Sequence, residues 1–179
     1  MSTYIALFRG INVGGRNILP MRDLVRELEA LDCEDVRTFI QSGNAVFQYP
    51  EKNTAALGVK IAKKIEDRHG FRPRILILNA RQLHKAIASN PFPDAEAEPR
   101  TLHLLFLASP PPAPKIDALN GAKLSSERFQ LTDHVFYLHA PEGIGRSKLA
   151  ANVEKLLGVP ATGRNWRTVM KLAEMVGAT

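Results

Sequence analysis

The feature that most limits the fold is an apolar run of strand length that leads directly into a glycine-rich, basic loop. Residues 3–9 have the apolar character of a buried strand, and residues 10–17 hold three glycines and an arginine. An amphipathic helix then begins near Pro20, with apolar residues at helical spacing from Met21 to Leu31. This start predicts an α+β domain whose loop brings backbone N–H groups and a cation together.

The rest of the first half also consists of predicted strands and a helix. Its predicted elements are strands over residues 36–41, 45–49 and 74–78, a turn over residues 42–44, and a helix over residues 53–69. The order β-α-β-β-α-β is that of the split βαβ, or ferredoxin-like, unit. Asn79 and Gln82 then have the spacing of a capping box, which predicts a short helix ending at Ala88.

The second half repeats much of this order. Its predicted elements are a strand over residues 101–107, a helix over 115–120, a hairpin over 129–131 and 135–139, a helix after Ser147 and a final helix near Asn165. A helix therefore stands where the first half has its fourth strand. We predict an α+β fold of two related ferredoxin-like units with antiparallel sheets and added C-terminal helices. The domains are residues 1–88 (βαββαβ plus a short helix) and 89–179 (βαββα plus the terminal helix).

Charge and cysteine usage limit the function classes. The 179 residues carry a net charge of +6, which favours acidic partners such as nucleotides or nucleic acid. Cys33 is the only cysteine, so a disulfide framework or a cysteine-based zinc site is excluded. No histidine pair has metal-ligand spacing, and no export leader or membrane span is evident. The sequence predicts a cytoplasmic protein with no metal, no cofactor and no membrane partner.

The loop over residues 10–17 has the glycine spacing of a P-loop but departs from that motif at its end. Arg16 and Asn17 stand where lysine and a hydroxyl residue bind phosphate and magnesium. This departure argues against a nucleotide triphosphatase. It favours a cradle for a phosphate or carboxylate group. The alternative is a structural loop whose glycines only permit positive φ.

A short basic triplet occurs three times in the chain. Residues 15–17, 145–147 and 163–165 each combine a glycine, an arginine and a small polar residue, and the last two precede helices. Three such turns around one cleft would bind a polyanion. The alternative is that Ser147 and Asn165 are helix N-caps with solvated arginines beside them.

The aromatic residues of the first sheet support two interpretations. By strand alternation Tyr4 and Phe8 share one face, as do Phe47 and Tyr49. Exposed aromatics on such a sheet are how RNA-recognition modules stack bases, but the consensus of that module is absent. The favoured interpretation is that this face packs against the second unit.

Three blocks of sequence identify a family resemblance. Residues 4–17, 38–47 and 161–166 resemble the signatures of the bacterial domain-of-unknown-function family 1697. The resemblance implies a duplicated α+β chain of ferredoxin-like units, and it supplies no activity. The positions that match the family's signature are Arg9, Gly10, Asn12, Gly14, Gly15, Asn17, Gln41, Ser42, Gly43, Asn44, Arg164, Asn165 and Trp166.

The leading hypothesis is a protein that binds an anionic, phosphate-bearing ligand, such as a nucleotide or nucleic acid, in a cleft between its two units. The candidate ligand-binding residues are the basic, amide, hydroxyl and glycine residues of these turns: Arg9, Asn12, Gly14, Gly15, Arg16, Asn17, Gln41, Ser42, Asn44, Arg146, Lys148, Arg164 and Asn165. The alternatives are an enzyme acting on a small phosphorylated substrate and a protein-interaction module. No residue is assigned a catalytic role, because the sequence offers no nucleophile motif and no acid–base pair.

Overall fold

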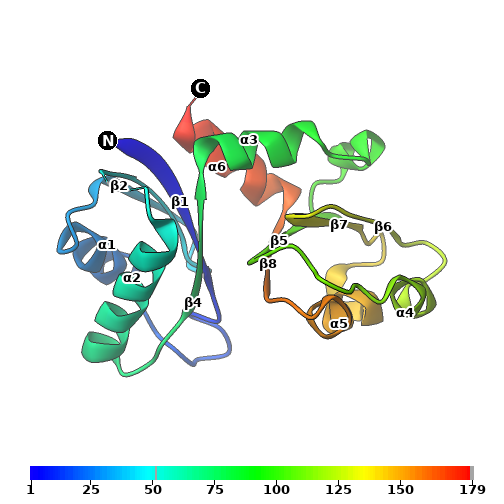
Figure 1. Cartoon of the computed structure of the whole chain (residues 1–179), viewed down its shortest axis with the longest axis horizontal. Coiled ribbons are helices and arrows are strands. Elements are labelled where there is room, and N and C mark those ends of the chain that lie inside the picture. The colour runs from blue at the N-terminus through cyan, green and yellow to red at the C-terminus, as the bar shows by residue number, and fades with distance from the viewer. Residues whose placement is uncertain (51, 178–179) are drawn as a thin grey trace. The chain divides into compact units, whose positions relative to one another are not determined.

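The computed structural model describes residues 1–50 and 52–177 (Figure 1). The chain divides into two compact units. Unit 1 comprises Met1–Lys85 and the C-terminal residues from Leu172, and unit 2 comprises Ala86–Lys171. The chain therefore passes from one unit to the other within helix α3 (Ala80–Ala88) and again within helix α6 (Trp166–Val176). The two sequence-predicted domains, residues 1–88 and 89–179, stay a prediction.

Unit 1 has the β-α-β-β-α-β order that the sequence predicts. Its elements are β1 (Ser2–Arg9), α1 (Met21–Glu29), β2 (Glu34–Phe39), β3 (Asn44–Tyr49), α2 (Thr54–His69) and β4 (Arg74–Asn79). The sheet order is β2-β3-β1-β4, and every neighbouring pair is antiparallel. The strand β1 is therefore central, so the loop that follows it leaves from the middle of the sheet.

Helices α1 and α2 lie on one face of this sheet, as Figure 1 shows. That face carries the aromatic residues, and the core beneath the helices includes Tyr4, Phe8, Phe47 and Tyr49, each at most 4% exposed. Both sequence interpretations of the aromatic face are therefore wrong. The rings are covered by the unit's own helices, because Leu24 and Leu28 of α1 and the apolar row of α2 need the same apolar surface.

The helix ends follow the sequence signals. The Asn53 side chain caps α2 by accepting the Ala56 N–H at 3.0 Å, and Gly70 closes that helix with φ +77°. The capping box at α3 is confirmed in both directions: Asn79 N–H donates to Gln82 Oε1 at 2.9 Å, and Gln82 N–H donates to Asn79 Oδ1 at 2.8 Å.

Unit 2 has the same topology as unit 1. Its elements are β5 (Leu102–Leu107), α4 (Ile116–Ala122), β6 (Arg128–Leu131), β7 (Val135–His139), α5 (Lys148–Leu157) and β8 (Ala161–Asn165). The sheet order β6-β7-β5-β8 matches that of unit 1 position by position, and α4 and α5 pack on one face around Leu119, Leu149 and Val153. Two short 3₁₀ turns, η1 (Pro93–Ala97) and η2 (Ile144–Arg146), lie in its loops.

The strand β8 corrects the sequence analysis, which placed only a helix at this point. The segment Ala-Thr-Gly-Arg-Asn has one β-branched residue and a glycine, so it lacks the composition of a strand. Pairing with β5 overrides this weak propensity along five residues, from His103↔Asn165 to Leu107↔Ala161. A Cβ at Gly163 would be in van der Waals contact with the Leu105 side chain, at 3.4 Å.

The predicted fold class is confirmed: the chain is α+β, with two related units that each contain an antiparallel four-stranded sheet. In the described part of the chain, no helix combines the length and apolar character needed to cross a membrane.

Candidate functional site

The glycine-rich loop after β1 contains a small hairpin. Val13 and Arg16 form an antiparallel bridge, and the Arg16 N–H donates to the Val13 carbonyl at 3.0 Å. Gly14 and Gly15 form the turn with φ of +57° and +73°, the conformation of a type I′ hairpin. Their N–H groups donate no hydrogen bond to any atom in the described part of the chain. The tip therefore presents exposed N–H groups next to the Arg16 side chain.

Asn12 connects this loop to the turn between β2 and β3. Its Nδ2 donates to the carbonyls of Leu19 at 2.9 Å and Gln41 at 2.8 Å, and its Oδ1 accepts the Leu19 N–H at 2.8 Å. Both N–H groups and the carbonyl oxygen of the amide are thus in use. Residues 9–20 and 40–43 form one surface, which we call the loop–turn surface.

Two more asparagines of the predicted ligand set also hold backbone in place. Asn17 Nδ2 donates to the Gly10 carbonyl at 2.8 Å. The buried Asn44 donates to the Phe39 carbonyl at 2.9 Å and approaches Ser42 Oγ at 3.5 Å. These contacts indicate that the asparagines shape the loop–turn surface, while Gln41 and Ser42 remain exposed on it.

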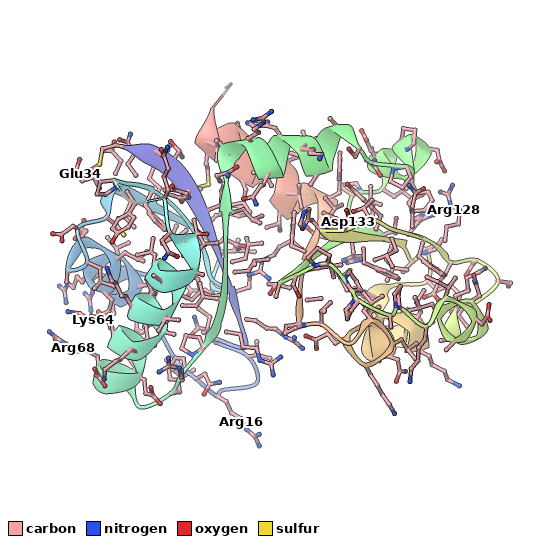
Figure 2. The ribbon with its side chains drawn as sticks, in the orientation of Figure 1. Arg16, Glu34, Lys64, Arg68, Arg128 and Asp133 are labelled. Atoms are coloured by element: carbon pink, nitrogen blue, oxygen red, sulfur yellow. The ribbon has the colours of Figure 1, made fainter. Side chains whose placement is uncertain are left out.

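Positive charge gathers at this end of the unit 1 sheet. Arg16 is exposed, and its guanidinium has no hydrogen-bond or ion-pair partner among the described residues; Figure 2 shows it projecting from the loop. Arg9 lies directly opposite Arg74 in the β1–β4 pairing. The two strand ends therefore place two arginines side by side at this edge of the sheet.

Arg74 was missed in the sequence analysis, although a signal for it exists. It is the first residue of β4, whereas Arg9 is the last residue of β1. Antiparallel pairing of the two strands brings these ends together. The β-α-β-β-α-β order implies this pairing, so the juxtaposition follows once the strand order is assumed.

The loop–turn surface also exposes large aliphatic side chains. Val13, Ile18 and Ile40 are 63%, 56% and 48% exposed. Ile40 has φ +52°, a left-handed conformation that is unfavourable for a β-branched residue. The fold thus holds an isoleucine outside the core at some cost in free energy.

We expect Ile40→Asn to raise the free energy of unfolding by about 1 kcal/mol, because asparagine tolerates the left-handed region and little apolar burial is lost. Chemical denaturation of the two proteins measures the change. A variant that is less stable than the wild type would contradict this account of the Ile40 backbone.

The predicted residues of unit 2 have clear local roles. Ser147 caps α5 by accepting the Ala150 N–H at 2.9 Å, and Asn165 Oδ1 accepts the Thr168 N–H at 3.0 Å at the start of α6. Both residues are therefore helix N-caps, as the alternative predicts, although Arg164 beside Asn165 is partly buried and not solvated. Arg146 and Lys148 are exposed. A joint site of these residues with the loop of unit 1 stays a prediction.

Arg164 differs from the other arginines of the predicted set. It is partly buried on β8, and its Nη1 donates to the Gly163 carbonyl at 2.8 Å. Burial lowers the pKa of its guanidinium to about 10. The group therefore remains charged at neutral pH.

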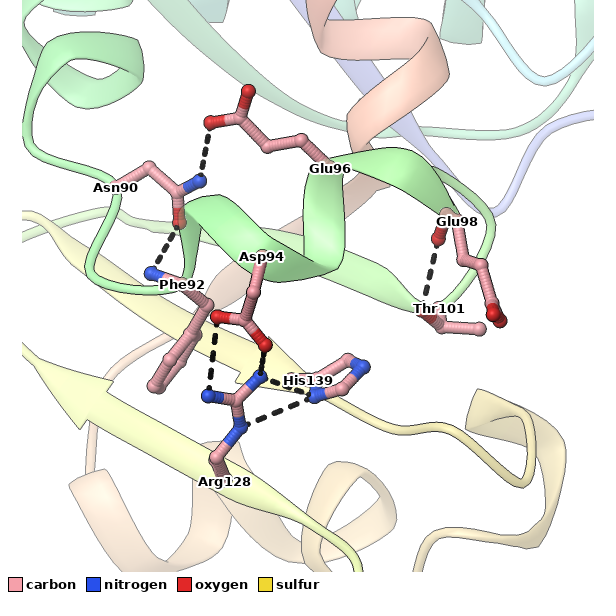
Figure 3. Close-up of polar contacts among 8 residues, drawn as sticks. All are labelled: Asn90, Phe92, Asp94, Glu96, Glu98, Thr101, Arg128 and His139. Carbon is pink, nitrogen blue, oxygen red and sulfur yellow. Dashed lines mark hydrogen bonds and ion pairs between the residues drawn. The ribbon is translucent and has the colours of Figure 1, made fainter.

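A polar cluster in unit 2 was not predicted at all. Figure 3 shows the Arg128 guanidinium between Asp94 and His139, with the Phe92 ring beside it. Arg128 Nη2 lies 2.7 Å from Asp94 Oδ2 and 2.9 Å from His139 Nδ1, and its Cζ lies 4.7 Å from the Phe92 ring centre. The cluster ties η1 to the β6–β7 hairpin, and the hydrogen bond from Arg128 lowers the pKa of Asp94.

Two histidines of unit 2 are held in the neutral form. Burial lowers the pKa of His103, against the opposing effect of its hydrogen bond to the Arg100 backbone. Burial also lowers the pKa of His139, and the charge of Arg128 acts in the same direction. Folding therefore disfavours protonation of both imidazoles.

We expect the free energy of unfolding to decrease as the pH is lowered from about 7 to about 5. Below the ordinary histidine pKa of about 6.5, the unfolded chain binds protons that the folded chain does not, so stability is lost as the pH falls. Thermal unfolding of the wild type and His103→Gln at both pH values measures the effect. The variant should lose less stability than the wild type, and an equal loss would contradict the role of His103.

The described residues offer little for redox or metal chemistry. Burial, followed by the charge of Asp32, raises the pKa of the Cys33 thiol to about 11, so the thiol is protonated at neutral pH. Among residues 1–50 and 52–177, no group of three His, Cys, Asp or Glu side chains is arranged to hold a metal ion.

The comparisons with known proteins identify a family and a solved structure with the same fold. Residues 1–137 match the model of a family described as a protein of unknown function, DUF1697. The chain belongs to the DUF1697 family. The sequence resemblance is thereby confirmed. The DUF1697 model includes the whole loop–turn surface and ends within β7 of unit 2.

A solved structure shares the fold of this DUF1697 chain. The conserved bacterial protein SP0830 from Streptococcus pneumoniae is 24% identical, with a TM-score of 0.71. The similarity covers 98% of this chain and 99% of that protein. It shows a common fold over the whole chain. No curated protein gives a significant match.

Proposed function

We propose that this protein binds an anionic, phosphate-bearing ligand, such as a nucleotide or nucleic acid, at the loop–turn surface of unit 1. The observation that carries the proposal is the Arg16 guanidinium, which has no partner among residues 1–50 and 52–177, beside the exposed N–H groups of Gly14 and Gly15. A cation and outward N–H groups on one rigid turn are the elements of an anion site. Arg9 and Arg74 add positive charge at the end of the same sheet.

The surface is suited to binding rather than to acid–base chemistry. Within residues 9–20 and 40–43, the ionisable side chains are Arg9 and Arg16. An arginine remains protonated at neutral pH and cannot act as a general base. The proposed activity is therefore recognition of charge. A cytoplasmic location accords with Cys33, which is a free, buried thiol.

A thermal-shift experiment with three probes tests this proposal: pyrophosphate, ATP and a short duplex DNA. A ligand that binds the native state raises the melting temperature, with about 2.7 kcal/mol of stabilisation at one hundred times its Kd. At least one probe should raise the melting temperature of the wild type, and Arg16→Ala should reduce that shift.

Arg68→Ala is the matched control, because Arg68 is an exposed arginine on α2 and Figure 2 shows it away from the loop. Its ligand-induced shift should equal that of the wild type. The proposal fails if none of the probes shifts the wild type, or if Arg16→Ala and Arg68→Ala respond alike.

A further inference from the structure

The loop–turn surface exposes aliphatic side chains as well as positive charge. Val13, Ile18 and Ile40 are three of the eight large hydrophobic residues that are exposed in the described part of the chain. Burying each from water would be favourable by roughly 1.5–3 kcal/mol. The hydrogen bonds of Asn12 hold the loop against the turn, so both segments contribute exposed aliphatic side chains to one surface.

The hairpin places a charged and an aliphatic side chain next to each other. Val13 and Arg16 are directly opposite each other in the hairpin bridge, so their side chains leave it on the same side. Gly14 and Gly15 carry no side chain, and no other atom lies within 4 Å of where a Cβ would stand, so the tip of the hairpin is narrow. The result is a small protruding hairpin that carries one aliphatic and one cationic side chain, with Ile18 following in the same loop.

These features fit a double-stranded partner better than a single-stranded one. Single strands bind through aromatic platforms on which bases stack. Residues 9–20 and 40–43 contain no aromatic side chain, and Tyr4, Phe8, Phe47 and Tyr49 of the neighbouring strands are buried under α1 and α2. Single-stranded nucleic acid therefore has no aromatic stacking surface here.

Proteins that enter the DNA minor groove combine arginines with aliphatic wedges, which separate base steps and bend the duplex. The net charge of +6 favours approach to DNA. We propose that the loop–turn surface binds the minor groove of duplex DNA, with Arg16 in the groove and Val13 and Ile18 as wedges that bend it. This inference rests on the proposed function and names the ligand class of the same surface.

The test uses the full chain and a duplex DNA of about 20 base pairs with a central TA step, labelled at both ends for energy transfer. Such steps bend at low cost. The wild type should bend this duplex and should bind it at least tenfold more tightly than the same sequence as a single strand. Replacing Val13 and Ile18 together by serine should abolish the change in energy transfer while leaving much of the salt-dependent binding.

Two further variants separate the contribution of the aliphatic side chains from that of the Arg16 charge. Val59→Ser is the matched control for the wedge, because Val59 is 58% exposed but lies on α2; it should bend the duplex like the wild type. Arg16→Ala should reduce the slope of log K against log salt by about one. Melting temperatures confirm that each variant is folded.

The outcomes distinguish the two proposals. Equal or tighter binding of the single strand, or unchanged bending by the Val13→Ser/Ile18→Ser variant, would overturn the wedge inference. Binding of ATP or pyrophosphate at the Arg16 surface without binding of duplex DNA would also overturn it, and would leave the proposed function standing. If no phosphate-bearing probe binds, both proposals fail.

Discussion

Replacing Gly43 with alanine is expected to destabilise the protein by about 2–5 kcal/mol. An added Cβ would lie 2.5 Å from Ile11 Cδ1 and 2.7 Å from Phe8 Cβ, closer than atoms pack. Gly43 also has φ +85°, which costs an alanine roughly 1–2 kcal/mol. Because the Gly43 carbonyl accepts the Phe8 N–H at 2.9 Å, the turn cannot move away without losing a contact to β1.

Gly70→Ala is the matched control for this prediction. Gly70 has φ +77°, but an added Cβ there would meet no atom within 4 Å. Its substitution should therefore show the conformational cost alone, roughly 1–2 kcal/mol. Chemical denaturation measures both variants. If Gly43→Ala destabilised the protein no more than Gly70→Ala, the close packing of the turn against β1 would be refuted.

Asn12→Ala is expected to destabilise the protein by about 2–4 kcal/mol. The substitution removes three hydrogen bonds, each contributing about 0.5–1.5 kcal/mol, and it uncouples the loop from the turn. The comparison variant is Asn17→Ala. Asn17 has nearly the same φ, +52° against +53°, but makes one side-chain hydrogen bond, to Gly10.

Because the two asparagines share a backbone conformation, the difference between their variants isolates the extra hydrogen bonds. We expect Asn12→Ala to cost about 1–3 kcal/mol more than Asn17→Ala. Equal destabilisation would show that the Asn12 amide does not hold the loop–turn surface together. The anion affinity of Asn12→Ala should also fall, because a loose loop must be ordered on binding.

The strand and helix pattern could be predicted because local signals were strong. The apolar run of β1 and the caps at Asn53 and Asn79 each had one clear interpretation. The strand β8 could not be predicted, because its residues have weak strand propensity and are held by pairing with β5. The sequence also could not show which element packs on the aromatic face. Both faces of the sheet carry apolar residues, so the pattern alone does not identify the face that α1 and α2 cover.

The candidate site was only partly predictable for a related reason. Residue type marks a polar side chain as a ligand candidate, but it does not reveal whether backbone groups already use its hydrogen-bonding atoms. Asn12 and Asn17 were expected to contact ligand, yet their amides bind loop carbonyls. The interaction of Arg128 with Asp94 spans 34 residues, and no sequence motif marks it.

The most direct test of the central claim is an amide NMR titration of the full chain with pyrophosphate. We predict that the largest shifts occur at Gly14, Gly15 and Arg16, because their N–H groups and the guanidinium would face the anion. The same titration of Arg16→Ala should need a higher concentration for the same shift. Shifts centred elsewhere, for example on α2 around Arg68, would contradict the account.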